Sequence, residues 1–503
     1  MKRMPRREFL GLAASAALAS AGASSVRFAR AADAPAPTPG PAATSATAPA
    51  PAGRPNVLLI NLDDLKANAI AALGNGDVKT PNLDALVARG RWFPRAYTMG
   101  SMVGAVCLPS RTMMLTGRSL FRIGGRGGGA PAAAAPGAGA GGAGAGAGGP
   151  IPLPTPMRAA GYETFHMGKG GNECKVAIEA FDHNIVSDDR GEGRAGSSQR
   201  HADRTIEFLR SRKAGRPFFI YLAPPVPHDP RLAPKEFTDL YDPAKITLPV
   251  NYLPQHPFDN GDMTVRDERL APWPRTPEII RRHLADYYAC VSCADHHIGR
   301  ILNALKDLGQ LDNTVVILIG DNGLSLGDHG LMGKQNLYEF GGMHVPMVVA
   351  GPGIPPGRSD AFVYLMDLYP TICDFGGAAV PDAVEGKSLL PILQGKLKSH
   401  RDVLYTAYQH GQRSVRDDRW KLIRYPLVDK TQLFDLANDP RELTDLSARP
   451  EHAAKAAELM TVLEKQQQLW ADKSPLKAPT PKPATWTPPT DKPGKAARKK
   501  KKE

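Results

Sequence analysis

Two short apolar segments constrain the fold of this chain more than any other feature of its sequence. Residues 55–62 read PNVLLINL and residues 314–320 read TVVILIG. Runs of this length, rich in aliphatic and β-branched residues, are typical of strands buried on both faces of a parallel sheet. Further patterns alternate with them, helical at 82–89, 202–212 and 279–308 and strand-like at 217–222 and 345–350. The alternation predicts an α/β fold with a large mixed, mostly parallel sheet flanked by helices.

Polar side chains follow both apolar segments at the point where each strand should end. Asp63 and Asp64 come directly after the first, and Asp321 and Asn322 after the second. In open parallel sheets, ligands bind beyond the carboxyl ends of the strands, so four oxygen donors can be gathered in one place. Hard oxygen donors suit Ca²⁺ or Mg²⁺. Either pair alone could equally belong to a turn or a helix cap, so the predicted metal site depends on both.

A third element carries a specific resemblance. Residues 107–111 read CLPSR and are followed by TGR at 116–118. This pattern resembles the signature of the type I, formylglycine-dependent sulfatases of the alkaline phosphatase superfamily. The resemblance implies that a formylglycine-generating enzyme converts Cys107 to 3-oxoalanine (formylglycine). The chemistry agrees, because a soft thiolate is a poor ligand for Ca²⁺ whereas an aldehyde hydrate offers oxygens to both metal and substrate. A buried structural cysteine before a helix is the alternative interpretation.

Further segments extend the resemblance over nearly all of residues 54–470. The segment 161–169 (GYETFHMGK) is similar to a sulfate-binding segment of the family, and PHDP at 227–230 to the segment that supplies a histidine to the ester oxygen. The segments DNG at 321–323 and LGDHGLMGK at 326–334 resemble those with two metal ligands and a second sulfate-binding lysine. The resemblance implies the catalytic residues Cys107, Arg111, Lys169, His228 and Lys334, and the metal ligands Asp63, Asp64, Cys107, Asp321 and Asn322, holding Ca²⁺ or alternatively Mg²⁺.

The family fold implied is alkaline-phosphatase-like, with a smaller C-terminal α+β subdomain. We expect a catalytic domain at 54–397 and a subdomain at 398–472, which reads as a few strands and a final helix. Residues 124–150 are almost wholly Gly, Ala and Pro, so they predict a loop inside the catalytic domain. The five cysteines are an odd number and cannot form a closed disulfide framework. Cys290 and Cys293 lie in a helical pattern, which favours two buried helix residues over a redox pair.

The resemblance also implies a mechanism and exposes a departure from the family. The hydrated aldehyde at position 107 would attack sulfur, Asp321 would accept its proton and His228 would protonate the departing alcohol. Relatives carry a histidine shortly after the lysine at position 169, but this chain reads KGGN at 169–172. Asn172 cannot act as a base near neutral pH, and His166 or His183 are possible replacements. His344 is a smaller departure, since relatives often carry arginine there.

The start of the chain resembles a twin-arginine export signal. Arg6 and Arg7 precede an uncharged, Ala-rich stretch that reaches Val26, with a small-residue cleavage site near 29–31. That stretch is too short and too Ala-rich for a comfortable membrane span, so we expect no stable membrane anchor. We therefore predict a signal peptide at 1–33, passage through the twin-arginine export machinery, and a bacterial protein that is periplasmic or extracellular.

Nearly all of the formal net charge of +13 lies at the two ends. Residues 1–33 carry six lysines and arginines against two acids, and residues 473–503 carry ten against two. Because the body between them is close to neutral, no nucleic-acid partner is expected. The Ala/Pro/Thr-rich residues 34–53 predict a disordered linker, and the basic Pro/Lys-rich residues 473–503 a disordered tail.

These observations predict an enzyme that hydrolyses sulfate esters, with a sulfated carbohydrate as the expected substrate. A phosphate or phosphonate ester hydrolase of the same superfamily is one alternative, because a metal, lysines and an arginine would also suit a phosphoryl group. The intact CLPSR segment favours sulfate. A catalytically weak relative that binds sulfated glycans is the other alternative, suggested by the missing histidine.

Overall fold

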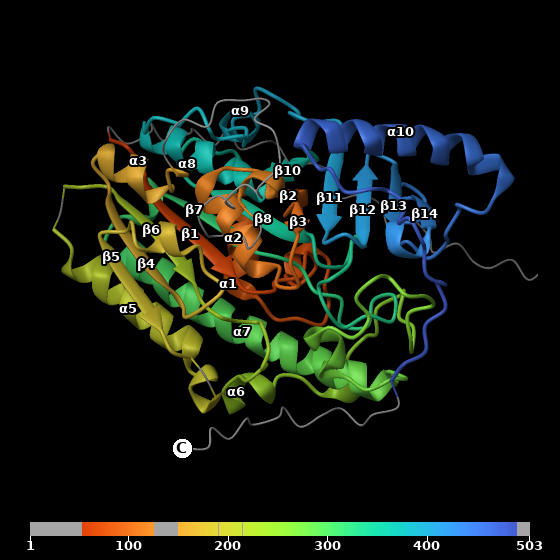
Figure 1. Ribbon diagram of the computed structural model, residues 1–503. Coiled ribbons are helices and arrows are strands. Elements are labelled where there is room, and N and C mark those ends of the chain that lie inside the picture. Colours follow the sequence, from red (N-terminus) through yellow and green to blue (C-terminus); the bar gives the residue numbers. More distant parts are fainter. Residues whose placement is uncertain (1–52, 125–148, 190, 214, 490–503) are drawn as a thin grey trace, which may run out of the picture. The chain divides into compact units, whose positions relative to one another are not determined.

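The structure is a computed structural model, and residues 53–124, 149–189, 191–213 and 215–489 of it are described (Figure 1). The predicted signal peptide at 1–33 lies outside the described residues, as do nearly all of the linker at 34–53 and of the Gly/Ala loop at 124–150. Among the described residues, none of the helices combines the length and the apolar character that crossing a membrane requires.

The described residues form one large sheet, in the order β10-β2-β8-β7-β1-β6-β4-β5, with β9 paired to β2. Its strands are β1 (Asn56–Leu62), β2 (Arg91–Tyr97), β4 (Glu163–Lys169), β5 (His183–Ser187), β6 (Phe218–Ala223), β7 (Thr314–Gly320), β8 (His344–Ala350), β9 (Gly357–Arg358) and β10 (Val363–Tyr364). The strands from β7 to β5 run parallel, whereas β8 is antiparallel to both of its neighbours. The predicted mixed, mostly parallel sheet is therefore confirmed.

The two apolar segments are the centre of this sheet. All residues of β1 and β7 are buried, and the two strands pair in parallel from Asn56 opposite Thr314 to Leu62 opposite Gly320. The register is what matters for function, because it makes both strands end at the same level. The polar residues that follow them, Asp63 and Asp321, are consequently brought side by side.

Helices cover both faces of the large sheet, as Figure 1 shows. One face of β1 packs with α1 (Pro81–Arg89), α5 (Ser197–Ser211) and α7 (Pro277–Asp307), the last of which also contacts α6 (Lys235–Thr238). The other face packs with α2 (Cys107–Thr116), α3 (Pro154–Ala159), α4 (Lys175–Ile178), α8 (Leu368–Gly376) and α9 (Leu390–Leu393). Cys290 and Cys293 are buried, unpaired residues of α7, which agrees with the helical interpretation.

A smaller sheet has the order β14-β13-β12-β11-β3. It consists of β3 (Gly100–Ser101), β11 (Leu404–Tyr408), β12 (Gln412–Arg416), β13 (Trp420–Tyr425) and β14 (Lys430–Asp435), and it packs against α10 (Ala453–Trp470). Strand β3 precedes Cys107 and pairs in parallel with β11. Gly100 has φ +123°, and a Cβ there would lie 1.8 Å from the carbonyl oxygen of Ala407. Only glycine permits this approach.

The small sheet contains β3, from before residue 397, and β11 to β14, from after residue 398. The division predicted between 397 and 398 therefore stays a prediction.

Residues 473–489 are not disordered, in contrast to the prediction made for the tail. Trp486 packs edge-on against Trp273 at 5.4 Å between ring centroids, and backbone hydrogen bonds join Ala478 to Pro426 and Lys482 to Leu427. Pro-rich composition predicts extended chain, but extended backbone can still donate and accept hydrogen bonds along a folded surface. Composition alone therefore could not distinguish a free tail from one that is bound to the body.

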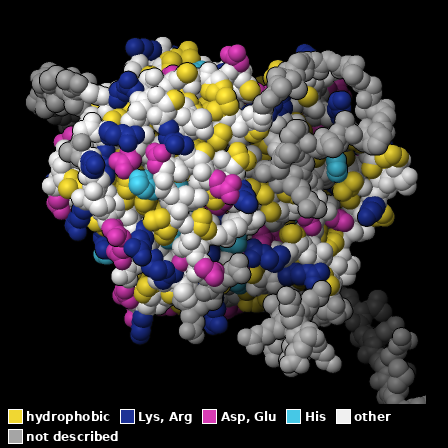
Figure 2. All heavy atoms as spheres, turned by 60° about the vertical axis from the view of Figure 1, so that its left-hand side comes forward, with side chains coloured by type: hydrophobic (Ala, Val, Ile, Leu, Met, Phe, Trp, Pro, Cys, Tyr) yellow, Lys and Arg dark blue, Asp and Glu magenta, His cyan; other side chains and the backbone are white. Residues whose placement is uncertain are grey.

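On the face shown in Figure 2, lysine and arginine side chains are interspersed with aspartate and glutamate. A mixture of this kind exerts little long-range attraction on ligands of either sign.

Asp472 ties the end of α10 to the small sheet. Its carboxylate accepts hydrogen bonds from Arg413 Nε and Tyr405 Oη, both at 2.5 Å. Burial would raise the pKa of Asp472, but Arg413 and Tyr405 lower it to about 2. A lowered pKa stabilises the fold above the pKa of the unfolded state, near 4, and that contribution is lost as the pH falls toward 2.

Asp472→Asn is therefore expected to cost about 2–3 kcal/mol of unfolding free energy at pH 7. Urea denaturation at pH 7, and at pH 4 and below, would measure the difference in unfolding free energy between the parent protein and Asp472→Asn. This difference should shrink as the pH falls. Asp418→Asn serves as the control, because that side chain is 85% exposed in its pair with Arg95. A pH-independent difference for Asp472→Asn would contradict the ionic explanation.

Candidate active site

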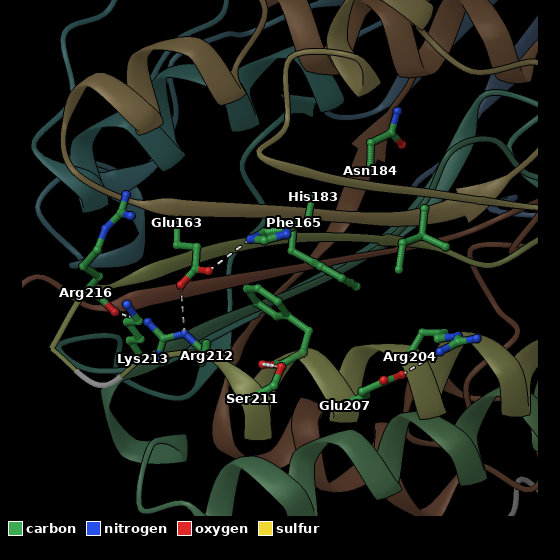
Figure 3. Close-up of a pocket in the computed structure, with 12 residues that line it drawn as sticks. Glu163, Phe165, His183, Asn184, Arg204, Glu207, Ser211, Arg212, Lys213 and Arg216 are labelled. Atoms are coloured by element: carbon green, nitrogen blue, oxygen red, sulfur yellow. Dashed lines mark hydrogen bonds and ion pairs between the residues drawn. The ribbon is translucent and has the colours of Figure 1, made fainter.

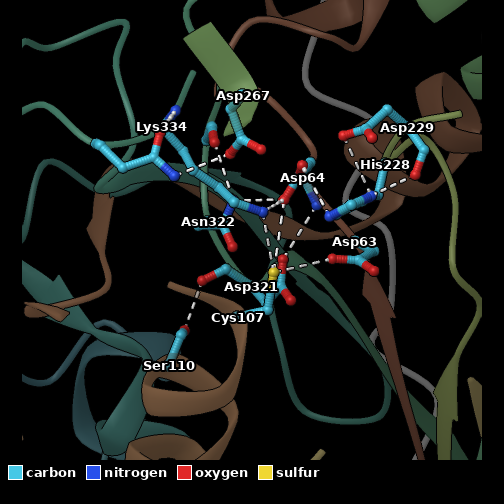
Figure 4. A network of polar contacts seen from close by, with 12 residues as sticks. Asp63, Asp64, Cys107, Ser110, His228, Asp229, Asp267, Asp321, Asn322 and Lys334 are labelled. Atoms are coloured by element: carbon cyan, nitrogen blue, oxygen red, sulfur yellow. Dashed lines mark hydrogen bonds and ion pairs between the residues drawn. The ribbon is translucent and has the colours of Figure 1, made fainter. Parts of the chain in front are cut away.

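The two polar pairs predicted from the sequence meet beyond the ends of β1 and β7 (Figure 4). The backbone amide of Asp64 donates to Asp321 Oδ1 at 3.0 Å, and Asn322 Nδ2 donates to Asp64 Oδ1 at 2.7 Å. Asp63 and Asp321 follow directly from the paired strands, and all four side chains are buried. Asp64 has φ +66°, a backbone conformation that is costly for a residue other than glycine and tends to occur at functional sites.

Cys107 is the first residue of α2 and lies against these acids. Its Sγ is 3.3 Å from Asp63 Oδ1 and 3.7 Å from Asp64 Oδ1. Burial, together with the charges of Asp321 and Asp63, raises the pKa of the Cys107 thiol well above its ordinary value. The unmodified thiol therefore stays protonated near neutral pH and would be a poor nucleophile.

Three cations surround the acids. Lys334 Nζ is 2.6 Å from Asp64 Oδ1 and 3.1 Å from Cys107 Sγ, and Lys169 pairs with Asp63. Arg111, which is fully buried, donates from Nε to Asp321 Oδ2 at 2.8 Å. They supply the fixed positive charge that a bound anion would require.

The charges shift the pKa values of the buried acids in different directions. Burial would raise the pKa of Asp63, but Lys169, His228, Arg111 and Lys334 hold it well below its ordinary value. The pKa of Asp321 is raised, first by burial and then by the charge of Asp63. The acids and cations thus form one electrostatically coupled group rather than separate ion pairs.

His228 follows β6 and is the partly exposed member of the group. Its Nε2 is 3.8 Å from Asp64 Oδ2, and its side chain is 12% exposed. Because the carbonyl oxygen of Asp229 can only accept, His228 Nδ1 donates to it at 2.6 Å. Nε2 is left facing the acids and is free to exchange a proton with a ligand.

The donor set fits a hard divalent cation. Ligand atoms of Asp63, Asp64, Cys107 and His228 lie within 4.8 Å of one another in the described part of the chain. Asn322 Oδ1 is a buried acceptor without a hydrogen-bond partner there. Buried acceptors without donors are costly, and a bound cation would satisfy this one and the neighbouring carboxylates. The cluster therefore fits a metal site, in agreement with the two predicted pairs.

The structure thus brings together all the site residues named from the sequence: Asp63, Asp64, Cys107, Arg111, Lys169, His228, Asp321, Asn322 and Lys334. Sequence reasoning missed Glu173, a buried residue whose carboxylate pairs with Arg111 Nη1. The sequence signal for Glu173 was an acidic residue just after the position where relatives carry the histidine that this chain lacks. Asn172, which lies between Lys169 and Glu173 in the sequence, has φ +55°.

The two histidines considered as replacements have different surroundings, and His166 lies within electrostatic reach of Arg111. His183 is at the start of β5 and contacts Glu163 at 3.1 Å in a cleft of about 660 Å³ between β5 and α5 (Figure 3). Glu163 begins β4 whereas Lys169 ends it, so the Glu163 end of the cleft is about 20 Å along the strand from Lys169. His166 is buried, its Nδ1 is 2.7 Å from Asn184 Oδ1, and burial lowers its pKa to about 4.

His344, the smaller departure from the family pattern, is the first residue of β8. Its ring stacks on Tyr97 of β2 at 4.7 Å between centroids, and its Nδ1 is 2.8 Å from the carbonyl oxygen of Glu339. The stacking joins neighbouring strands and the hydrogen bond joins β8 to the segment before it, which gives the histidine a structural explanation.

Comparisons with known proteins agree with this geometry. The family model described as Sulfatase matches residues 55–378, and one described as N-sulphoglucosamine sulphohydrolase, C-terminal, matches residues 327–469. The chain is 25% identical to an N-acetylglucosamine-6-O-sulfatase of Bacteroides thetaiotaomicron over 84% of this chain and 88% of that protein. It is 28% identical to an arylsulfatase of Clostridium perfringens over 82% of this chain and 94% of that protein.

Solved structures show the same fold. A protein in complex with its substrate D-glucosamine-2-N,6-O-disulfate matches with a TM-score of 0.66 and 23% identity, covering 84% of this chain and 99% of that one. The phosphonate monoester hydrolase of Agrobacterium radiobacter matches with a TM-score of 0.69 and 21% identity, covering 84% and 97%. The predicted fold class and family are confirmed. Because the Sulfatase model matches well over half of its residues, the chain belongs to the sulfatase family and is a sulfuric ester hydrolase.

Proposed function

We propose that this chain hydrolyses sulfate esters of a sulfated carbohydrate and that the nucleophile is a formylglycine hydrate at position 107. The observation that carries the proposal is the position of Cys107 Sγ, in contact with Asp63 and with Lys334 at the start of a helix. The substrate class is supported by the relative whose name states N-acetylglucosamine-6-O-sulfatase. The leaving group of a substrate of this kind is an alcohol of low acidity.

The group that would hold the metal consists of Asp63, Asp64, Asp321 and Asn322 together with the modified residue 107. Ca²⁺ is the ion that we propose, with Mg²⁺ as the alternative, since both prefer oxygen ligands. When bound, the ion would supply positive charge beside the sulfate oxygens. The modified residue requires a two-electron oxidation of the thiol-bearing carbon by an external oxidant such as dioxygen, followed by hydrolysis that leaves the aldehyde and releases sulfide. A formylglycine-generating enzyme would carry this out.

The proposed reaction proceeds in two steps, a displacement at sulfur followed by an elimination. One hydroxyl of the aldehyde hydrate attacks sulfur while Asp321 accepts its proton, and the bond from sulfur to the alcohol oxygen breaks. His228 Nε2 gives a proton to the departing alcohol. The second hydroxyl of residue 107 then loses its proton to water, the bond from its carbon to the sulfate oxygen breaks as the aldehyde re-forms, and sulfate leaves. A water molecule adds to the aldehyde and restores the hydrate. Lys169, Lys334 and Arg111 stabilise the charge on the sulfate oxygens throughout.

We also propose export of the protein to the periplasm or the medium. The support is the pair Arg6-Arg7 ahead of an uncharged stretch in the N-terminal sequence. Twin-arginine machinery carries folded proteins, so modification of residue 107 and metal binding would precede export.

The proposal predicts a mass change at residue 107. Protein produced together with a formylglycine-generating enzyme should yield a peptide of residue 107 whose mass deficit matches exchange of the thiol for an aldehyde. Protein produced without the enzyme is the control and should retain the thiol and release little sulfate from N-acetylglucosamine 6-sulfate. Sulfate release at equal rates by both preparations would sink the proposed nucleophile.

Phosphonate monoester hydrolysis is a second candidate, favoured by the structural likeness to an enzyme of that name. The modified protein should be assayed on matched sulfate and phosphonate esters, and a higher kcat/KM on the phosphonate would favour this candidate. A protein that retains a sulfated polysaccharide without releasing sulfate would instead be a glycan-binding relative.

A further inference from the structure

The segment that carries His228 is held from inside the protein by Arg194. This buried arginine donates from Nη2 to the carbonyl oxygen of His228 at 2.8 Å and to that of Asp229 at 3.3 Å, and it also contacts the carbonyl of Pro225. Three backbone acceptors between residues 225 and 229 are thus bound by one guanidinium group. The backbone position of His228 is fixed by these contacts, but its ring orientation is not.

A second arginine binds the same segment from outside. Arg266, in the 3-10 helix η5 (Arg266–Leu270), has a side chain that is 58% exposed. Its Nη1 is 2.8 Å from Asp229 Oδ2 and its Nη2 is 2.9 Å from Asp229 Oδ1. This is a bidentate fork, the arginine–carboxylate geometry that fixes orientation most strongly. The Asp229 carboxylate that it holds is 3.4 Å from His228 Nδ1.

The same arginine reaches toward Lys334. Arg266 Nε donates to Asp267 Oδ1 at 2.9 Å, and Asp267 Oδ2 accepts from Gln335 Nε2 at 2.8 Å. Gln335 Oε1 in turn accepts from the backbone amide of Lys334 at 3.0 Å. Figure 4 shows Asp229 and Asp267 on either side of the catalytic group. One exposed arginine therefore connects the segments of the proposed leaving-group acid and of a sulfate-binding lysine.

We propose that Asp229 and Arg266 are positioning residues that hold the His228 imidazole with Nε2 toward the leaving alcohol. The inference rests on the proposed function, in which His228 is the general acid. The backbone carbonyl oxygen of Asp229 accepts from His228 Nδ1, and the Asp229 carboxylate also lies beside Nδ1. Both contacts favour the same orientation of the imidazole ring. A misplaced acid costs most when the leaving alcohol is weakly acidic, because an acidic phenol departs without receiving a proton.

The test compares two aryl sulfates of similar size, 4-nitrophenyl sulfate and 4-methoxyphenyl sulfate, whose phenols differ in acidity. Asp229→Asn and Arg266→Ala are each expected to lower kcat/KM on the methoxyphenyl ester by about 10- to 100-fold, and on the nitrophenyl ester by only a few fold. Arg266→Lys should recover only part of the loss, since an ammonium group cannot form the fork.

Arg419→Ala is the matched control. Its side chain is 55% exposed and makes a bidentate pair with Asp435 in the small sheet, at 3.0 and 2.7 Å. It should leave both rates unchanged, and melting temperatures would confirm that all variants fold. Equal losses on both esters for Asp229→Asn and Arg266→Ala would overturn the inference. If the modified parent protein cleaves neither ester, nor N-acetylglucosamine 6-sulfate, the proposed function itself fails.

Discussion

Replacing Cys107 with serine is expected to give a protein that releases one equivalent of alcohol and then stops. Serine offers a single hydroxyl group, so it can accept sulfate, but it has no second hydroxyl from which an aldehyde could re-form. The geometry supports transfer, because the side chain at 107 lies between Asp63 and Lys334. Steady-state turnover should fall by about 10⁵-fold or more, the order seen when an enzyme nucleophile is removed.

Rapid-mixing measurements on 4-nitrophenyl sulfate would record the burst, and mass spectrometry would locate a sulfated residue at 107. Cys107→Ala is the control and should show neither burst nor adduct. Steady turnover by the serine variant at a rate near that of the parent would show that residue 107 does not need two hydroxyls, and the proposed displacement and elimination would then be wrong.

Removal of the metal is expected to have the second largest effect, on both stability and activity. Without a cation, the carboxylates of Asp63, Asp64 and Asp321 stay buried together, and Asn322 Oδ1 stays without a partner. An ion that binds only the folded state, present at 100 to 1,000 times its Kd, stabilises it by about 3–4 kcal/mol. Dialysis against a chelator should therefore lower both the melting temperature and the rate.

Calorimetry with Ca²⁺ and Mg²⁺ added back separately would identify the ion, and the better ligand should restore the higher melting temperature. Asn322→Ala is the informative variant, because it removes one proposed ligand and leaves the three carboxylates in place. It should weaken the response to the ion. A melting temperature that is the same with chelator and with either ion would argue against a metal at this position.

For a physical reason, the sequence allowed the central part of the fold to be predicted and the residues of the candidate site to be placed together. The segments 55–62 and 314–320 are predominantly aliphatic, a pattern that few structures other than central parallel strands explain. The parallel register then leaves little freedom for the residues that follow. The motifs at 107–111 and 326–334 supplied the remaining groups through their resemblance to the family.

Contacts between side chains far apart in the sequence could not be predicted in this way. Arg266 and Asp229 are 37 positions apart, and their pairing depends on how the loop before α7 crosses the end of β6. Glu173 reaches Arg111 by a similar coincidence of loop and helix. Composition misled for residues 473–489, where proline-rich chain is bound to the folded surface. These features depend on the tertiary arrangement, which local pattern does not encode.

The pairing of β3 with β11 also bears on the timing of synthesis. Strand β3 lies just ahead of the CLPSR segment, but its partner at residues 404–408 is translated about 300 residues later. At roughly 5–20 residues per second, a ribosome needs about 15–60 s to reach it. During that interval residues 107–111 have been translated while the strand before them lacks its neighbour. Under the proposed function, this order of synthesis would leave the segment of residue 107 open to the modifying enzyme while most of the protein is still being made.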